Sequence, residues 1–294
     1  MIADAETNFV YFSELLKSEP KYQAFHDQWI AILANHKIAY DYLPETRDIW
    51  CRDYMPLQVE KERFIEYRYD PDYLLDRKGR SLKTYTDMVC ASIGLKTVKS
   101  DLILDGGNVI RWKDKVIMTD KVIQENAYHY RKAGLLKKLQ EAFQVDEIIL
   151  IPWYTKEKFG HADGMLRFVD GNTVLVDGYY RYEKSGIGEK LFRILKSHHL
   201  EAVPLQFKVN NESRYNWGYL NFLQIKDLLL VPQFGIDEDL QALDQIRKLF
   251  PEYAAKGQID TIDARVLIKE GGVLNCASWN IEKNATIWEN PMPQ

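Results

Sequence analysis

Five polar residues recur along this 294-residue chain at nearly constant intervals, and this periodicity constrains the fold more than any other feature. Successive members are 55, 55, 58 and 55 positions apart. The five residues are Asp53, Asn108, Asp163, Asn221 and Cys276. A fixed period of this length is the signature of an architecture built from repeated supersecondary units. Five units of about 55 residues account for nearly the whole chain.

A strand, a short polar turn and a second strand accompany three of these positions, which is the pattern of a β-hairpin. The hairpins are predicted over residues 107–119, 164–177 and 218–233. An amphipathic helical pattern follows each hairpin, and a further β-rich run follows each helix. The helices are predicted over residues 122–143, 189–199 and 237–250. An earlier copy of the unit starts at Thr46, and a partial copy closes the chain over residues 270–281.

Units of ββαβ type bury their helices against their own strands, and five of them around a pseudo-fivefold axis enclose a central channel, as in propeller architectures. We therefore predict an α/β fold, a five-bladed α/β-propeller, in which the equivalent polar residues meet at one axial site. One domain is expected over residues 1–294, with a short N-terminal extension before the first unit. The alternative is a generic α/β fold in which the spacing is coincidental.

Charge and cysteine content limit the classes of partner and the compartment. The 39 basic and 43 acidic residues give a net charge of −4, so we expect neither nucleic acid nor an anionic membrane as a partner. No segment approaches the 18 apolar residues that a membrane span needs. Three cysteines without a C-x-x-C pair disfavour disulfides and structural zinc, so we expect the cytoplasm and no metal.

The residues expected at the axial site have a definite chemistry. Asp53, Asp163 and Cys276 would meet there, with His161 two positions before Asp163 and Asp105 directly before a glycine pair. A thiol, an imidazole and three carboxylates without a lysine favour a cationic ligand. A guanidinium fits best, because its N–H donors pair with carboxylate oxygens in bidentate fashion.

Hydrolysis of a guanidinium needs a strong nucleophile and a proton donor for the leaving nitrogen, since resonance makes the central carbon a poor electrophile. Cysteine supplies the nucleophile and histidine supplies the proton. The carboxylates raise the pKa of the thiol in the empty site, whereas a bound cation lowers it. These residues predict a C–N hydrolase that works without a cofactor.

Five short blocks stand in order between residues 47 and 280. They are W-x-R-D at 50–53, D-G-G-N at 105–108, G-H-x-D at 160–163, Y-x-N-F at 219–222 and G-G-x-x-x-C at 271–276. In this order they resemble the agmatine deiminases and bacterial peptidylarginine deiminases, which are guanidine-modifying enzymes of the pentein α/β-propeller fold. The resemblance implies that such a chain converts a guanidino group to a ureido group and ammonia.

The resemblance also implies roles for individual residues. Cys276 would form a thiouronium-type covalent intermediate, and His161 would act as general acid for ammonia and then as base for water. Asp53 and Asp163 would clamp the guanidinium nitrogens, and Asp105, where the family has glutamate, would orient the histidine. The expected substrate-binding residues are Trp50, Arg52, Asn108 and Asn221.

Several alternatives stay open at this point. Asn275 precedes Cys276 where agmatine deiminases have histidine, so the substrate is agmatine, arginine, or a peptidyl or modified arginine. An amidinotransferase or a dimethylarginine-type hydrolase would use the same residues, and a non-catalytic pentein would be a binding protein. The acidic and aromatic segment 64–76 is expected near the mouth of the site. The sequence does not fix the oligomeric state.

Overall fold

The computed structural model describes residues 1–284, which form five small sheets of three strands each. Each sheet holds the three strands of one unit. The first two strands of the unit pair antiparallel, and the third pairs in parallel with the second. A parallel neighbour requires a crossover connection, and helices supply it. The predicted α/β fold of five ββαβ units is confirmed.

Four of the sheets are continuous in sequence. Their strands are β3 (Leu57–Glu60), β4 (Arg63–Arg68) and β5 (Val98–Ile103); β6 (Ile110–Trp112), β7 (Lys115–Thr119) and β8 (Glu147–Ile151); β9 (Leu166–Phe168), β10 (Thr173–Asp177) and β11 (Glu201–Leu205); and β12 (Leu223–Ile225), β13 (Leu228–Gln233) and β14 (Ile259–Asp263). The fifth sheet combines β15 (Trp279–Ile281) with β1 (Phe9–Ser13) and β2 (Ala39–Leu43).

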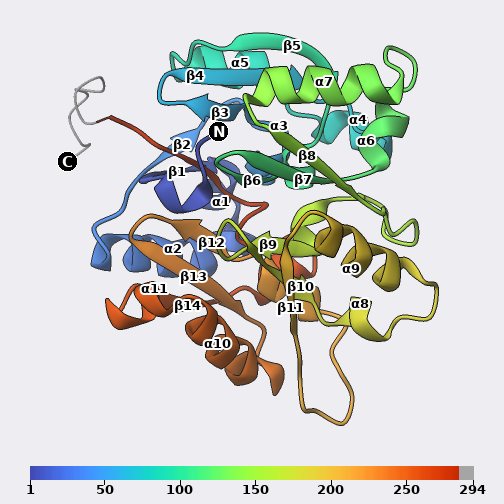
Figure 1. The fold of residues 1–294 in the computed structure, drawn as a ribbon. Helices are drawn as coiled ribbons and strands as arrows, with labels where there is room; N and C mark the ends of the chain where they lie inside the picture. Colours follow the sequence, from blue (N-terminus) through green and yellow to red (C-terminus); the bar gives the residue numbers. More distant parts are fainter. Residues whose placement is uncertain (285–294) are drawn as a thin grey trace.

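The helices lie mostly outside the strands, while β6, β9 and β12 lie toward the middle of the molecule (Figure 1). The α-helices are α1 (Leu15–Ser18), α2 (Gln23–Asn35), α3 (Cys51–Tyr54), α4 (Arg77–Leu82), α5 (Thr86–Ser92), α6 (Lys121–Glu125), α7 (Lys132–Phe143), α8 (Tyr179–Tyr182), α9 (Ile187–Ser197), α10 (Glu238–Leu249), α11 (Pro251–Ala255) and α12 (Arg265–Ile268). The 3₁₀ turns are η1 (Asp4–Glu6), η2 (Pro20–Tyr22), η3 (Asp72–Leu74), η4 (Gly106–Asn108), η5 (Ala162–Gly164) and η6 (Asn216–Leu220).

The N-terminal segment corrects one prediction, because it is part of the fifth unit and not an extension. Strand β15 pairs antiparallel with β1, with Trp279 opposite Tyr11, and β1 pairs in parallel with β2. The partial copy at the C-terminal end holds only the first strand of a unit. The chain's first strands and α2 supply the rest, so β15 and β1, which lie far apart in the sequence, meet in one sheet.

The predicted helix over residues 122–143 is also corrected, since the chain forms two helices there, α6 and α7. Asn126 ends the first helix. Its fully buried side-chain nitrogen donates to the carbonyls of Ile103 and Val122, and its side-chain oxygen accepts from the Ile103 amide. These bonds tie the helix end to β5 and divert the backbone. The connection between β4 and β5 likewise holds two short helices, α4 and α5.

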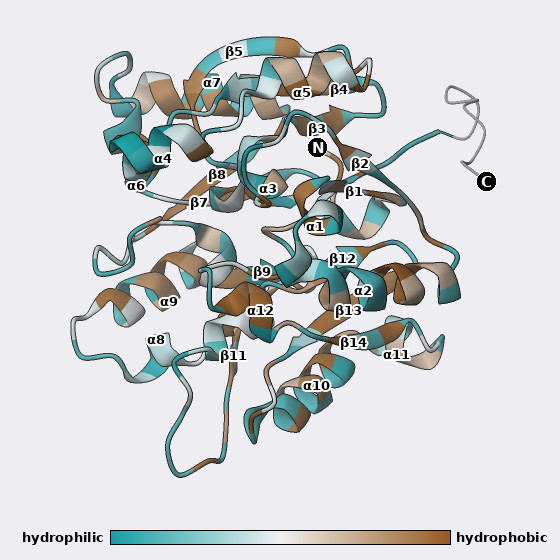
Figure 2. Ribbon diagram, turned by 180° about the vertical axis from the view of Figure 1, so that it is seen from behind, coloured by the Kyte–Doolittle hydropathy of each residue, from teal (hydrophilic) through white to brown (hydrophobic). Residues whose placement is uncertain are grey.

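The core forms between the sheets and the helices, and helices also pack on a neighbouring sheet, since α9 contacts β8 as well as β11 and α2 contacts β14 as well as β2. Helix α7, for example, buries Leu135, Leu139 and Phe143 completely, at the four-residue spacing of one helix face. Hydrophobic residues concentrate on strands such as β13, and hydrophilic residues on the connecting loops (Figure 2). Within residues 1–284, no helix combines the length and the apolar character that crossing a membrane would need.

Each unit enters its first strand through a short helical turn, and these turns position the candidate site. The turns are α3, η4, η5, η6 and the turn over residues 274–277. Helix α3 contacts η4, η4 contacts η5, and η5 contacts η6. Each recurring polar residue lies in or directly after its turn, so five segments distant in sequence converge.

Candidate active site

The convergent turns bring a thiol, an imidazole and three carboxylates into one buried cluster. Cys276, Asp53, Asp105 and Asp163 are each 7% exposed or less, and the side chain of His161 is 10% exposed. The sequence-based expectation was that these five residues would meet, and their side chains lie in this one cluster. Such an arrangement of buried ionisable groups is typical of a catalytic centre.

Cys276 lies at the side of Asp163. Its Sγ atom is 3.4 Å from Asp163 Oδ2, and its backbone amide donates to Asn221 Oδ1 at 3.1 Å. Burial raises the pKa of the Cys276 thiol well above its usual range, and the charges of Asp163 and Asp53 raise it further. The thiol is therefore protonated while no cation occupies the site.

His161 lies between two carboxylates. Its Nε2 atom is 3.0 Å from Asp105 Oδ2, and its Nδ1 atom is 3.6 Å from Asp53 Oδ1. Burial opposes the charged imidazolium, but Asp53, Asp105 and Asp163 together raise the pKa of His161 to about 10. At neutral pH the ring is thus a charged proton donor with both nitrogens directed at acceptors.

Asp53 is held by the backbone of the neighbouring unit. The Gly107 amide donates to Asp53 Oδ1 at 3.1 Å. Burial raises the pKa of Asp53 to about 8, the charge of His161 opposes this rise, and Asp105 and Asp163 add to it. A bound cation would reverse this effect, so the carboxyl group is suited to a positively charged ligand.

Two amide side chains orient Asp163. Asn221 Nδ2 and Asn275 Nδ2 both donate to Asp163 Oδ2, at 2.9 and 2.8 Å. Asn221 was expected at the site, whereas Asn275 was noted only as a departure from the agmatine deiminase pattern. The position of Asn275 directly before Cys276 is the sequence signal that could have indicated a functional role.

Two further residues that were expected to bind substrate bond to the protein itself. Arg52 donates from Nε to the Asn275 carbonyl at 3.2 Å, and its backbone amide donates to the Cys276 carbonyl at 3.1 Å. Asn108 accepts from the Thr119 amide at 2.8 Å. Both side chains thus hold neighbouring backbone, and a contact with substrate stays a prediction for each.

Aromatic rings surround the reacting groups. Trp50 is half-buried and packs so closely on Gly272 that a side chain there would overlap the indole. The ring centroids of Phe159 and Tyr73 lie 5.8 and 6.0 Å from that of His161. Trp50 was expected as a wall of the site, and Tyr73 comes from the aromatic segment expected near its mouth. Nothing in the motifs singled out Phe159.

Lys121 holds the loop that carries His161 in place. No sequence motif indicated this role. The side chain is 2% exposed, and its Nζ atom donates to the Phe159 carbonyl at 2.8 Å and to Asp72 at 2.9 Å. The ammonium also lies 5.2 Å from the centre of the Tyr73 ring. Lys121 thereby links the loop before His161 to η3.

The two other cysteines are buried apart from this chemistry. Cys51 and Cys90 are free thiols, and burial raises the pKa of each to about 12. In the part of the chain that the structure describes, no group of three or more histidine, cysteine and acidic residues is arranged to hold a metal ion.

The fold defines the class of protein. Five ββαβ units with a cysteine, a histidine and carboxylates at their convergent turns form a pentein, and the solved structures that it resembles support this fold. An agmatine deiminase of Campylobacter jejuni has a TM-score of 0.68 over 96% of each chain, at 20% identity. An agmatine deiminase of Enterococcus faecalis has a TM-score of 0.71 over 96% of this chain and 95% of its own, at 14% identity.

Within this class the chain belongs to the Porphyromonas-type peptidyl-arginine deiminase family, whose model matches residues 5–281. A protein from Mycoplasma capricolum, provisionally named an agmatine deiminase, is 24% identical over 225 residues. That alignment covers 64% of this chain and 60% of the relative, so the chain spans less than two thirds of the relative's length.

Proposed function

We propose that this protein is a deiminase that hydrolyses a guanidino group to a ureido group and ammonia. The observation that carries the proposal is the contact between Cys276 Sγ and Asp163 Oδ2 at 3.4 Å, in a cluster where His161 lies between two more carboxylates. Membership of the deiminase family supports the same conclusion. The cluster supplies a nucleophile, a proton donor and anionic groups for a planar cation.

Binding is the first step of the proposed mechanism. Asp53 and Asp163 accept the N–H groups of the guanidinium, so the carbon between those nitrogens lies beside Cys276. The cation offsets the negative charges that raise the pKa of the thiol, and the thiol releases its proton to solvent. Occupancy of the site and activation of the nucleophile are therefore coupled.

The first half-reaction forms the covalent intermediate. The thiolate attacks the guanidinium carbon, and a C–S bond forms as the C=N bond becomes single. His161 then donates its proton to one nitrogen, and the C–N bond breaks to release ammonia. A positively charged thiouronium on Cys276 and a neutral imidazole remain, and Asp105 keeps the ring oriented.

The second half-reaction releases the product. Neutral His161 removes a proton from water, and the hydroxide adds to the thiouronium carbon. The C–S bond then breaks with its electron pair going to sulfur, while the hydroxyl proton re-forms the thiol as the ureido carbonyl appears. The imidazolium and the thiol are thus restored, and each cycle consumes one water.

We further propose a small cationic guanidino compound as the substrate and the cytoplasm as the compartment. The acidic site supports the first proposal, and the free state of the three cysteines is consistent with the second. The net charge of −4 gives no support for binding nucleic acid. Asp53, Asp163, Asn221 and Trp50 are the proposed contacts of the guanidino end.

The test is incubation with agmatine, free arginine, an N-blocked arginine peptide and dimethylarginine, with ammonia, alkylamine and ureido product measured separately. Ammonia and a ureido product in equal amounts from one substrate would support a deiminase. Methylamine or dimethylamine release would indicate a dimethylarginine-type hydrolase, and amidine transfer to added glycine would indicate an amidinotransferase. Absence of turnover of every compound would overturn the proposal.

A further inference from the structure

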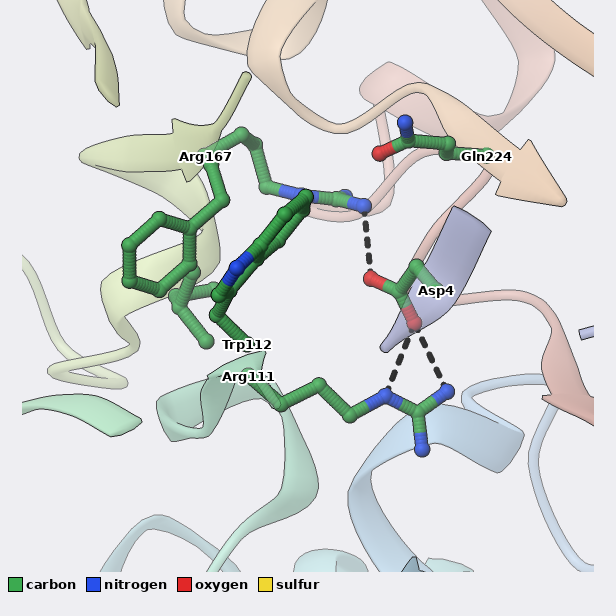
Figure 3. Close-up of a pocket in the computed structure, with 7 residues that line it drawn as sticks. Asp4, Arg111, Trp112, Arg167 and Gln224 are labelled. Atoms are coloured by element: carbon green, nitrogen blue, oxygen red, sulfur yellow. Dashed lines mark hydrogen bonds and ion pairs between the residues drawn. The ribbon is translucent and has the colours of Figure 1, made fainter. Parts of the chain in front are cut away.

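A second buried cluster of charges lies away from the thiol, at the middle of the five sheets, and the N-terminal Asp4 is its centre. Asp4 Oδ1 accepts from Arg111 Nε at 2.9 Å and Nη2 at 2.7 Å, and Oδ2 accepts from Arg167 Nη2 at 2.9 Å (Figure 3). Asn280 Nδ2 also donates to Asp4 Oδ1 at 3.2 Å. Only about 10 Å³ of cavity remains beside these groups, so the side chains fill the middle of the fold.

All five units contribute to this cluster, which we call the axial cluster. Its members are Asp4 with Arg52 from the first unit, Arg111 from the second, Arg167 from the third, the Gln224 carbonyl from the fourth and Asn280 from the fifth. The three arginines are each 5% exposed or less, and Asp4 is the carboxylate that bonds to two of them. Burial opposes the charge on Asp4, but Arg111, Arg167 and Arg52 hold its pKa far below the usual range.

A continuous chain of hydrogen bonds leads from the axial cluster to the nucleophile. The side-chain oxygen of Asn280 accepts from Arg52 Nη2. Arg52 Nε in turn donates to the Asn275 carbonyl at 3.2 Å, and the Arg52 amide donates to the Cys276 carbonyl at 3.1 Å. The guanidinium of Arg52 thus connects the axial cluster to the peptide groups that carry the thiol and the amide of Asn275.

Removal of the Asp4 charge would leave Arg111 and Arg167 without their shared carboxylate and Arg52 without a neighbouring negative charge, and buried charges are strongly destabilised without a partner. Asn280 would also lose one acceptor of its side-chain nitrogen. Both changes act on Arg52, which has its own bonds to the nucleophile segment. A displacement of about 1 Å at a reacting group lowers the rate by about 100-fold.

We propose that Asp4 is a positioning residue for Cys276, acting through Asn280 and Arg52. The turn before β1 thereby becomes part of the active-site framework, although it lies outside every motif. This inference rests on the proposed function for its kinetic readout, but its chemical readout is independent of any substrate.

The test compares Asp4→Asn with the control Glu6→Gln, a change of the same kind at a half-buried position in the same turn that bonds to none of the three arginines. For Asp4→Asn we expect kcat to fall by about 10- to 100-fold while KM changes by less than about twofold, because the clamp carboxylates are untouched. Without substrate, iodoacetamide should alkylate Cys276 about tenfold faster, since the loosened segment opens more often. Mass spectrometry of the Cys90 peptide gives the internal control.

A second variant covers the case in which Asp4→Asn does not fold, as judged by its thermal transition. Thr7 Oγ1 accepts from Asn280 Nδ2 at 2.8 Å and donates to the Asp4 carbonyl at 2.6 Å. Thr7→Val keeps the shape and removes both bonds, so it should produce smaller shifts of kcat and alkylation rate in the same directions. Wild-type kcat and alkylation rate in every folded variant would overturn the inference, and inactivity of the wild type would overturn only the proposed function.

Discussion

The Sγ atom of Cys276 lies 3.4 Å from Oδ2 of Asp163, so the nucleophile and one arm of the proposed cation clamp are in direct contact. The same carboxylate oxygen accepts from Asn221 and Asn275, which fix it in place. Its charge opposes ionisation of the thiol until a cation arrives. Asp163 thus controls both the binding of the guanidinium and the reactivity of the Cys276 thiol.

Asp163→Asn should therefore change the two properties in opposite directions. Loss of the negative charge lowers the pKa of the Cys276 thiol, so iodoacetamide should alkylate the empty site faster at neutral pH. Loss of the clamp lowers kcat/KM for the guanidino substrate by about 100-fold or more. The measurement is a pH series of alkylation rates beside steady-state kinetics. A slower alkylation in the variant would contradict the electrostatic role of Asp163.

Cys276→Ala should abolish turnover, with a loss of kcat of at least about 1,000-fold, because no other group in the cluster replaces the sulfur nucleophile. Cys90→Ala is the matched control. Cys90 is buried with its pKa raised to about 12, and a substitution there removes packing without chemistry. The measurement is the rate of ammonia release by each variant. Equal losses in both variants would mean that Cys276 is not the nucleophile.

The pH profile of kcat/KM should be bell-shaped with limbs near 8 and 10. Asp53 has a pKa of about 8 in the free protein and must be ionised to accept the guanidinium N–H groups, so the rate rises through this pH. His161 has a pKa of about 10 and must be protonated to release ammonia, so the rate falls above it. The two limbs are macroscopic values of a coupled group.

Asp105→Asn tests the assignment of the upper limb. The carboxylate at 3.0 Å favours the charged imidazolium, so its removal should move the alkaline limb to lower pH. Asp244→Asn, at an exposed position on α10, is the control and should leave both limbs in place. An alkaline limb that does not move in Asp105→Asn would assign that limb to another group.

The sequence predicted the units well because, in a ββαβ repeat, strand, turn and helix patterns recur at a constant spacing. Asp53, Asp163 and Cys276 occupy equivalent turns, and the period alone brings them together. Chemistry assigned the histidine as proton donor, and the resemblance to known deiminases added its second role as base for water and the role of Asp105. Both contributions depend on local patterns, namely hairpin spacing and short motifs, which a single sequence displays directly.

The features that the sequence did not reveal are contacts between units that have no local pattern. Asp4 is one acidic residue near the N-terminus, and contacts between units, among them the pairing of β1 with β15 and the contact of η1 with β12, bring it to the arginines. Lys121 likewise acts on the His161 loop across 38 positions of sequence. Asn126 interrupts a helical pattern by bonding to a strand, and tertiary bonds of this kind override local propensity.

Gly107 provides a test of how closely the site is packed. A methyl group on its Cα would lie 2.6 Å from His161 Nδ1 and 2.7 Å from Asp53 Oδ1, so Gly107→Ala must push both side chains apart. We expect kcat/KM to fall by about 100-fold, because reacting groups tolerate little displacement.

Gly134→Ala is the control, since nothing lies within 4 Å of the added methyl and the residue is inside α7. That variant should keep full activity and gain about 0.5–1 kcal/mol in the free energy of unfolding. Thermal unfolding and initial rates of both variants give the answer, and wild-type kinetics in Gly107→Ala would mean that Asp53 and His161 are not held in the geometry described.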